Sequence, residues 1–80
     1  MARFELFGTN SCPFTQEVRD WLDWQGHDYA EYNVEADDDA LDRMYALTSG
    51  QRTIPVLVED GKVVQIGWQG RGCAVNKRST

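Results

Sequence analysis

The sequence has few of the residues that mark a metalloprotein, a disulfide-rich secreted protein or a membrane protein. Its 80 residues include one histidine and two cysteines. These three side chains cannot form a four-ligand zinc site within one chain, and small secreted domains usually carry more cysteines. No apolar run approaches the length of about 20 residues that a membrane-spanning helix needs. We therefore expect no metal site and no membrane association.

Positive charge is also scarce. Eight lysines and arginines stand against 13 aspartates and glutamates, which gives a net charge of −5. Because no basic stripe is present to neutralise a phosphate backbone, we expect no nucleic-acid partner. No charged segment followed by an apolar run stands at the N-terminus. We expect a cytoplasmic monomer with its thiols reduced at rest, formed by one domain over residues 1–80.

Strand-like and helix-like patterns alternate along the chain and predict an α/β fold. Apolar runs rich in β-branched or aromatic residues indicate strands, and apolar residues at helical spacing indicate helices. The acidic run at residues 37–39 is interpreted as a helix cap rather than a metal site, because no second acidic or histidine cluster completes an oxygen cage. The predicted order is βαβαββ, with strands 4–7, 29–34, 53–58 and 62–66, helices 13–25 and 40–47, and a short C-terminal helix.

The motif with the most chemical information is Cys12-Pro13-Phe14-Thr15. It follows the first predicted strand and opens the first predicted helix, where Pro13 suits the first helical position. A thiolate at such an N-cap accepts backbone N–H groups that have no partner in the helix, and the dipole lowers the thiol pKa by roughly one unit. Most free cysteines are inert apolar groups, but this placement favours a nucleophile.

The roles of Cys73 and Thr15 each have two interpretations. Cys73 is either a resolving thiol that forms a disulfide with Cys12 on oxidation or a tail cysteine without a partner. Gly70 and Gly72 give its loop the freedom to approach Cys12, and a Cα separation much beyond about 7 Å would exclude the bond. Thr15 either donates its hydroxyl to the Cys12 thiolate or is an ordinary residue of the first helical turn.

The Cys-Pro-aromatic motif together with Arg52-Thr53-Ile54-Pro55 resembles the glutaredoxin branch of the thioredoxin fold. That branch has an Arg-Thr-Val-Pro loop in which the proline is cis and faces the active sulfur. The resemblance implies a minimal thioredoxin fold with a four-stranded mixed sheet. Residues 66–71 are similar to a stretch of the glutaredoxin-like electron donors to ribonucleotide reductase. The whole pattern is similar to the Uxx-star family, some of whose members carry selenocysteine at the position of Cys12.

The resemblance implies a thiol–disulfide oxidoreductase, or electron carrier, that uses Cys12 as nucleophile and Cys73 or glutathione as resolving thiol. Thr15 stands where the family has its second cysteine, so the motif is of the monothiol type. No cofactor is required, glutathione is a candidate co-substrate, and the expected partners are thiol or disulfide proteins and a thioredoxin reductase. The implied catalytic residues are Cys12, Cys73, Pro13 and Thr15, and the implied substrate-binding residues are Phe14, Arg52, Thr53, Ile54, Pro55, Trp68 and Gly70.

Three alternatives stay open. The second class of function is a pair of chains that holds an iron–sulfur cluster through Cys12 and glutathione, as monothiol glutaredoxins do. Against this, Pro13 stands where their Cys-Gly-Phe-Ser motif has a glycine. A redox-inactive adaptor is the third class of function. For Trp68, packing in the core or on the surface is the alternative to substrate binding.

Overall fold

The computed structural model describes residues 3–75, which form two helices and six strands. The elements are β1 (Phe4–Gly8), α1 (Pro13–Gln25), β2 (Tyr29–Asn33), α2 (Asp38–Thr48), β3 (Thr53–Ile54), β4 (Val56–Glu59), β5 (Lys62–Ile66) and β6 (Cys73–Ala74). Within the described part of the chain, neither helix has the length and apolar character needed to cross a bilayer.

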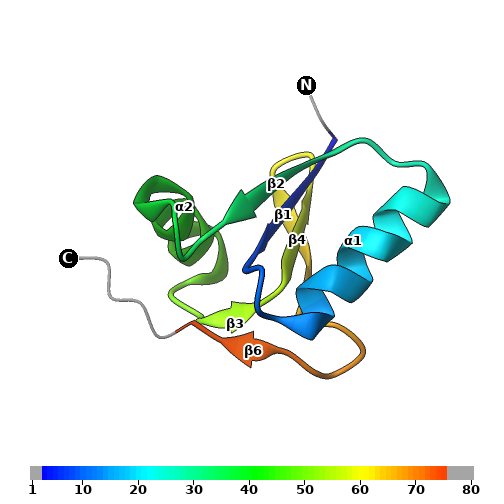
Figure 1. Ribbon diagram of the computed structural model, residues 1–80. Coiled ribbons are helices and arrows are strands. Elements are labelled where there is room, and N and C mark those ends of the chain that lie inside the picture. Colours follow the sequence, from blue (N-terminus) through cyan, green and yellow to red (C-terminus); the bar gives the residue numbers. More distant parts are fainter. Residues whose placement is uncertain (1–2, 76–80) are drawn as a thin grey trace.

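Four of the strands form a mixed sheet in the order β2-β1-β4-β5. β1 is parallel to β2 and antiparallel to β4, and β5 is antiparallel to β4. The helices α1 and α2 lie on opposite faces of this sheet (Figure 1). The predicted α/β architecture with a four-stranded mixed sheet is confirmed.

Two apolar clusters fill the spaces between the sheet and its helices. Successive side chains of a strand point to opposite faces, so Phe4 and Leu6 of β1 pack on the α1 side and Phe7 packs on the α2 side. Val18 and Leu22 complete the first cluster, whereas Leu41 and Met44 of α2 join the second. The second cluster also contains Cys12 and Ile54, so the core continues to the C-terminal end of β1.

The helix ends follow the sequence signals. Asp37 is the N-cap of α2, and its carboxylate accepts the backbone N–H groups of Asp39 at 3.1 Å and Ala40 at 3.2 Å. This confirms the interpretation of the acidic run as a cap. Gly26 follows α1 with φ 74°, a left-handed conformation that glycine adopts without strain. The N-terminal cap of α2 and the C-terminal end of α1 therefore lie where the sequence predicts.

The predicted strand over residues 53–58 is two strands in two different sheets. The Ile54–Pro55 peptide bond is cis, and it separates β3 from β4. β4 joins the main sheet, whereas β3 pairs antiparallel with β6 in a separate two-stranded sheet. Proline has no N–H to donate to a ladder, which is why a continuous strand through Pro55 was the wrong prediction.

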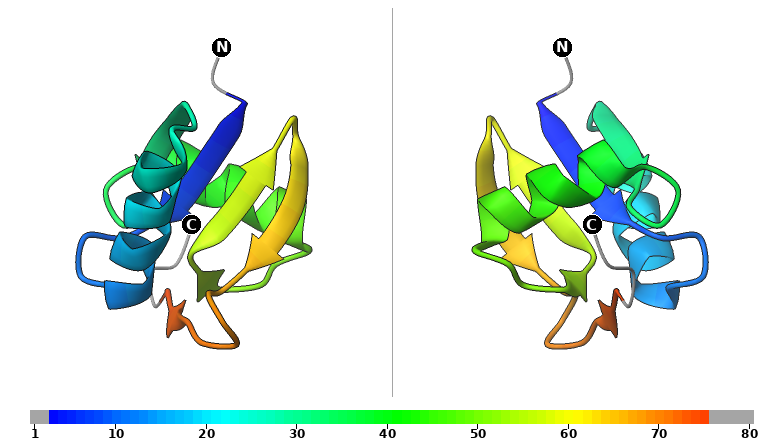
Figure 2. Two further views of the ribbon diagram at one scale, coloured as in Figure 1. Left: turned by 90° about the vertical axis from the view of Figure 1, so that its right-hand side faces the viewer. Right: turned by 90° about the vertical axis from the view of Figure 1, so that its left-hand side faces the viewer.

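The short C-terminal helix is not present in residues 67–75, and residues 76–80 lie outside the described residues. The backbone N–H of Trp68 donates to the carbonyl of Arg71 at 2.6 Å, and the reverse bond is 2.9 Å. Gln69 and Gly70 form the tip of this tight turn with positive φ, which no right-handed helix contains. The chain then runs past the lower end of the sheet to β6 (Figure 2).

Candidate active site

Cys12 occupies the predicted place at the N-terminus of α1. It is the N-cap residue, in an extended conformation with φ −89° and ψ 116°, and Pro13 takes the first helical position. The loop between β1 and α1 is short, and Gly8, the last residue of β1, lies against Thr15. A Cβ at position 8 would overlap the Thr15 side chain, so glycine is needed there for the strand and the first helical turn to meet.

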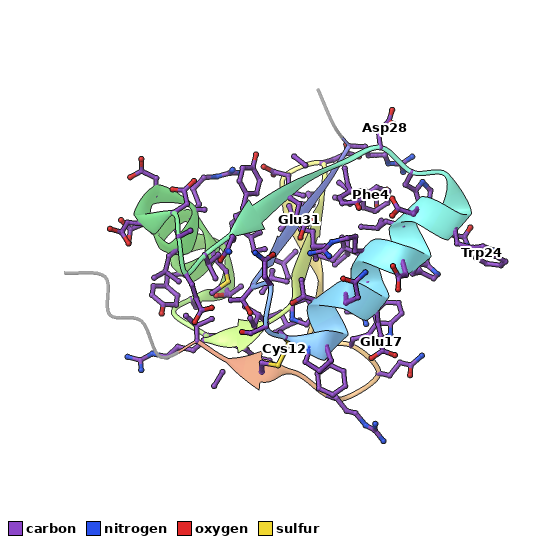
Figure 3. The ribbon with its side chains drawn as sticks, in the orientation of Figure 1. Phe4, Cys12, Glu17, Trp24, Asp28 and Glu31 are labelled. Carbon is purple, nitrogen blue, oxygen red and sulfur yellow. A yellow bond between two sulfur atoms is a disulfide. The ribbon has the colours of Figure 1, made fainter. Side chains whose placement is uncertain are left out.

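Cys12 and Cys73 form a disulfide, although they lie 61 positions apart in the chain. Their Cα atoms are 6.1 Å apart, within the range that a disulfide spans. The two sulfurs are therefore in contact, as the resolving-thiol interpretation of Cys73 requires. The interpretation of Cys73 as a tail cysteine without a partner is wrong. Figure 3 shows the bond beneath the N-terminus of α1, beside β6. The structure shows the pair as a disulfide. That the thiols are reduced at rest stays a prediction.

The other wall of the site is the segment that precedes Pro55. The cis Ile54–Pro55 bond is the one that the resemblance implies. Ile54 is buried in the same cluster as Cys12, and it lies directly opposite Cys73 in the β3–β6 pair. Phe14 packs against this cluster from α1 and is half-buried. The structure therefore brings Cys12, Phe14, Ile54 and Cys73 together.

The edge of β3, expected to be a platform for substrate, is occupied by the chain's own β6. Thr53 pairs with Ala74, and the N–H of Val75 donates to the carbonyl of Arg52 at 2.9 Å. Gly72 permits this approach, because a Cβ there would lie 2.7 Å from the Ile54 carbonyl oxygen. This strand was not predicted from the sequence. The available signal was the apolar run that follows Gly72 in an otherwise polar tail.

Thr15 lies under the disulfide end of α1 and is completely buried. Within residues 3–75 its hydroxyl oxygen has no hydrogen-bond partner, and the Cys12 side chain makes no capping hydrogen bond. A buried hydroxyl without a partner costs about 1–3 kcal/mol. The predicted hydrogen bond from Thr15 to sulfur is thus not formed in the disulfide state. Its formation with the reduced Cys12 thiolate stays a prediction.

Trp68 and Gly70 belong to the turn between β5 and β6. The Trp68 ring lies 6.0 Å from that of Trp21, measured between centroids, and it packs on the apolar cluster under α1. This placement agrees with the packing interpretation of Trp68. Gly70 is exposed, with open space around its Cα. Roles for these two residues in substrate binding stay predictions.

The two cysteines differ in exposure, and exposed arginines stand near Cys73 and β3 in the sequence. Cys12 is 3% exposed, whereas Cys73 is half-buried. Arg71 and Arg52 are both exposed on the segments that form the β3–β6 pair. In the described range of the chain, no three histidine, cysteine or carboxylate side chains are grouped so that they could hold a metal ion.

A mixed sheet between two helices, a cysteine at the first helix N-terminus and a cis-proline beside it define a thioredoxin-like protein with a cysteine pair. The chain belongs to the glutaredoxin family, whose family model matches residues 4–64.

Individual relatives agree with this assignment. The probable glutaredoxin slr1562 of Synechocystis sp. is 35% identical over 60 residues, which cover 74% of this chain. The match spans about half of that relative, 55% of its length. The crystal structure of a mutant of the thioredoxin-like protein BC3987 has a TM-score of 0.76 and 29% identity, and 86% of each chain is covered. The buckwheat glutaredoxin–glutathione complex has a TM-score of 0.67 at 24% identity, over 82% of this chain and 61% of that one, and it shows the shared fold.

Proposed function

We propose that this protein is a thiol–disulfide oxidoreductase in which Cys12 and Cys73 alternate between a disulfide and two thiols. The observation that carries the proposal is the disulfide itself, which joins the N-cap of α1 to β6 across 61 residues. Membership of the glutaredoxin family supports the same chemistry. The motif is monothiol, because Thr15 replaces the usual second cysteine, and Cys73 supplies the resolving thiol from another part of the chain.

In the proposed cycle the Cys12 thiolate attacks one sulfur of a substrate disulfide. The substrate S–S bond breaks, its electron pair leaves with the other substrate sulfur, and a mixed disulfide forms on Cys12. The Cys73 thiolate then attacks the Cys12 sulfur and releases the second substrate thiol. The substrate gains two electrons and the protein forms the disulfide seen here. The helix N-terminus favours the Cys12 thiolate over the thiol, so Cys12 is the stronger candidate for the first attack.

Glutathione is the proposed alternative resolving thiol and co-substrate. The buckwheat glutaredoxin of similar fold was solved with glutathione, and glutathione is a small thiol with two carboxylates. Arg71 is an exposed cation two residues before Cys73, and Arg52 is an exposed cation directly before β3, in a chain of net charge −5. Their charges favour an anionic thiol at this end of the molecule. Thiol proteins and a thioredoxin reductase are the other proposed partners.

The iron–sulfur hypothesis is not favoured by any feature of the described site. Pro13 occupies the first helical position, where the Cys-Gly-Phe-Ser motif of the cluster-binding proteins has a glycine. Anaerobic purification would distinguish the two functions, since a cluster-binding module would emerge brown and dimeric.

Two finer assignments accompany the proposal. We also propose that the chain belongs to the Uxx-star group, on the basis of its whole sequence pattern, in which Cys12 stands where some members carry selenocysteine. Replacing Cys12 by selenocysteine should then give an active protein with a lower midpoint for the pH dependence of alkylation. A monomeric, cytoplasmic protein is also proposed, and size-exclusion chromatography together with cell fractionation would test these two points.

The decisive experiment measures reduction of a small disulfide, bis(2-hydroxyethyl) disulfide, with glutathione and glutathione reductase as one electron source and thioredoxin reductase as the other. Cys12→Ser should lose turnover with both sources. Cys73→Ser should retain turnover with glutathione, which can replace the missing resolving thiol, and lose it with the reductase alone. Wild-type turnover no faster than the uncatalysed exchange, or an active Cys12→Ser variant, would reject the proposal.

A further inference from the structure

We propose that this protein acts on polypeptide segments in which a cysteine is preceded by glycine and followed, two positions later, by a branched apolar residue such as valine. The proposal rests on the redox function given above, and it names the class of substrate. The observation behind it is the chain's own segment Gly72-Cys73-Ala74-Val75, which has this pattern and is bonded to Cys12. The disulfide form thus shows how a polypeptide cysteine lies when it is joined to the nucleophile.

Backbone contacts hold this segment beside the nucleophile, and they do not depend on its side chains. β6 pairs antiparallel with β3, with Cys73 opposite Ile54, and Figure 1 shows the two short strands side by side. The N–H of Val75 donates to the carbonyl of Arg52 at 2.9 Å. An extended segment of another protein makes bonds of this kind when it adds a strand to a sheet edge. Selection of the sequence therefore has to come from the side chains.

The position before the cysteine is restricted to glycine by lack of space. A Cβ at Gly72 would lie 2.7 Å from the carbonyl oxygen of Ile54 and 2.8 Å from Cγ2 of Thr53. Gly72 does not have the left-handed φ of Gly67, so conformational freedom is not the reason for a glycine at this position. Because one of the two obstacles is the backbone of β3, a larger residue here would push the whole paired segment away from β3.

Two positions after the cysteine, the structure provides a buried apolar place. Alternate residues of a strand point to the same side, so Cys73 and Val75 point inward together and Ala74 points outward. Val75 is 1% exposed, whereas Ala74 is exposed. Val75 belongs to the apolar cluster that also contains Cys12 and Ile54. A polar side chain at this position of a bound segment would be buried in that cluster at a cost, whereas the position directly after the cysteine is free to vary.

The chemical step exchanges one strand for another at the edge of β3. In the dithiol form β6 is held by noncovalent contacts alone, and a substrate strand of the same pattern replaces it. The Cys12 thiolate attacks the sulfur of the substrate cysteine, the substrate S–S bond breaks, and its electron pair leaves with the other sulfur. When β6 returns, the Cys73 thiolate attacks the Cys12 sulfur and the substrate cysteine leaves as a thiolate. In reverse, the same steps let a thiol of this pattern reduce the disulfide, so substrate and reductant proteins use one edge.

Capture of short peptides by the Cys73→Ser variant tests the pattern, because Cys12 is then the only cysteine of the chain. The probe is the peptide Arg-Gly-Cys-Ala-Val, blocked at both ends and bonded through its cysteine to thionitrobenzoate, whose release is followed by absorbance. Alanine in place of the glycine, or serine in place of the valine, should each lower the second-order rate constant about tenfold or more. Serine in place of the peptide's alanine is the matched control, for which a change of less than about twofold is expected. Reaction of the same peptides with free cysteine corrects for their intrinsic reactivity.

Two results would overturn the proposed recognition and leave the oxidoreductase standing. One is an equal corrected rate for all the peptides. The other is turnover of bis(2-hydroxyethyl) disulfide by the wild type while every peptide is captured no faster than by free cysteine. The activity can fail separately, since selective capture of the glycine–valine peptide without turnover of the small disulfide would reject the catalytic cycle and leave the recognition standing.

A change in β6 itself gives an independent measurement of competition for the same place. In Cys73→Ser/Val75→Ser the chain's own segment loses its buried apolar side chain, so capture of the glycine–valine peptide should become about three- to tenfold faster. Cys73→Ser/Ala74→Ser changes an exposed residue and is the matched control, for which no acceleration is expected. Far-UV circular dichroism checks that both variants are folded. An unchanged rate in the folded Val75→Ser variant, or equal acceleration in both, would show that the peptide does not bind where β6 lies.

Discussion

The two ends of the four-stranded sheet are held together in different ways. At the end where β1 leads into α1, the Cys12–Cys73 disulfide joins the segments, and a buried Thr15 hydroxyl is left without a partner in the described structure. At the opposite end, charged side chains pair on the surface, as Arg3 does with Glu59 and Arg43 with Glu5. Natural proteins leave such local conflicts mainly at functional sites, so the comparison itself indicates which end is chemically active.

The opposite end also contains a surface hollow, but its polar groups serve one another. It is lined in part by Arg3, Glu5, Tyr32 and Arg43. Two hydrogen bonds of 2.9 and 3.0 Å join the Arg43 guanidinium to the Glu5 carboxylate. A hollow whose main charges are paired with each other offers no unsatisfied group to a ligand. The hollow at the charged end is therefore not a candidate binding site.

The largest expected effect is on the disulfide. The chain-entropy model gives a stabilisation of about 4 kcal/mol for a loop of this length. We expect reduction, or the Cys73→Ser variant, to lower the free energy of unfolding by up to that amount in urea titrations. The Cys12→Ser/Cys73→Ser double variant is the control, since its unfolding should not respond to reductant. If reduction left the urea unfolding midpoint of the wild type unchanged, the disulfide would not stabilise its end of the sheet.

Crowding the contact between β6 and β3 should have the next largest effect. In Gly72→Ala the new Cβ would lie 2.7 Å from the Ile54 carbonyl oxygen and 2.8 Å from Thr53 Cγ2, so β6 must move away from β3. We expect the disulfide to be destabilised by about 1–3 kcal/mol, measured as a shift of the dithiol–disulfide equilibrium in a thiol redox buffer. Gly70→Asn is the control, because the space there is open and asparagine tolerates a left-handed φ. Equal shifts in both variants would argue against the close contact.

Removing the unpaired hydroxyl sharpens the comparison further. Thr15→Val keeps the shape of the buried side chain and should leave the oxidised protein as stable or more stable by about 1 kcal/mol. In the reduced protein it should raise the pKa of Cys12, measured as the pH dependence of alkylation, if the hydroxyl donates to the thiolate. Thr48→Val is the control, since the Thr48 hydroxyl is bonded to the Met44 carbonyl at 2.8 Å in α2. An unchanged Cys12 profile would give Thr15 a packing role alone.

The smallest effect belongs to the charged end. The hydrogen bonds from Arg43 hold the pKa of Glu5 below its ordinary value of 4.5. A depressed folded-state pKa contributes stability above the unfolded value, and this is lost as pH falls through the folded pKa. Arg43→Gln should therefore lower stability by no more than about 1 kcal/mol at neutral pH, with the difference vanishing in acid.

Urea titrations across pH would measure this last effect. Glu5→Gln supplies the double-mutant cycle, because the Arg43 substitution should cost less once the carboxylate is gone. A loss that persists unchanged in acid would assign the contribution of Arg43 to its packing over the Phe7 and Tyr32 rings.

The local signals of the sequence were sufficient for the main sheet and for Cys12. Apolar spacing, Asp37 and Gly26 fixed the helices, and the Cys-Pro step located the N-cap. The β3–β6 pair depends instead on contacts between residues about 20 positions apart, which no local pattern of Thr53-Ile54 or Cys73-Ala74 reveals. The position of Cys73 was likewise undetermined, because a glycine-containing loop permits many paths. Burial of Cys12 beneath that segment became visible only in three dimensions.

Because β6 pairs with β3, the disulfide also keeps the edge of β3 covered by β6. While the bond is intact, the backbone of residues 52–54 is matched to residues 73–75, and another chain can pair there only by displacing β6. Displacement is opposed by a covalent bond that only a reductant removes. The same two electrons that restore the Cys12 thiolate therefore also allow β6 to leave, so that a reactive sulfur and a free strand edge would become available together.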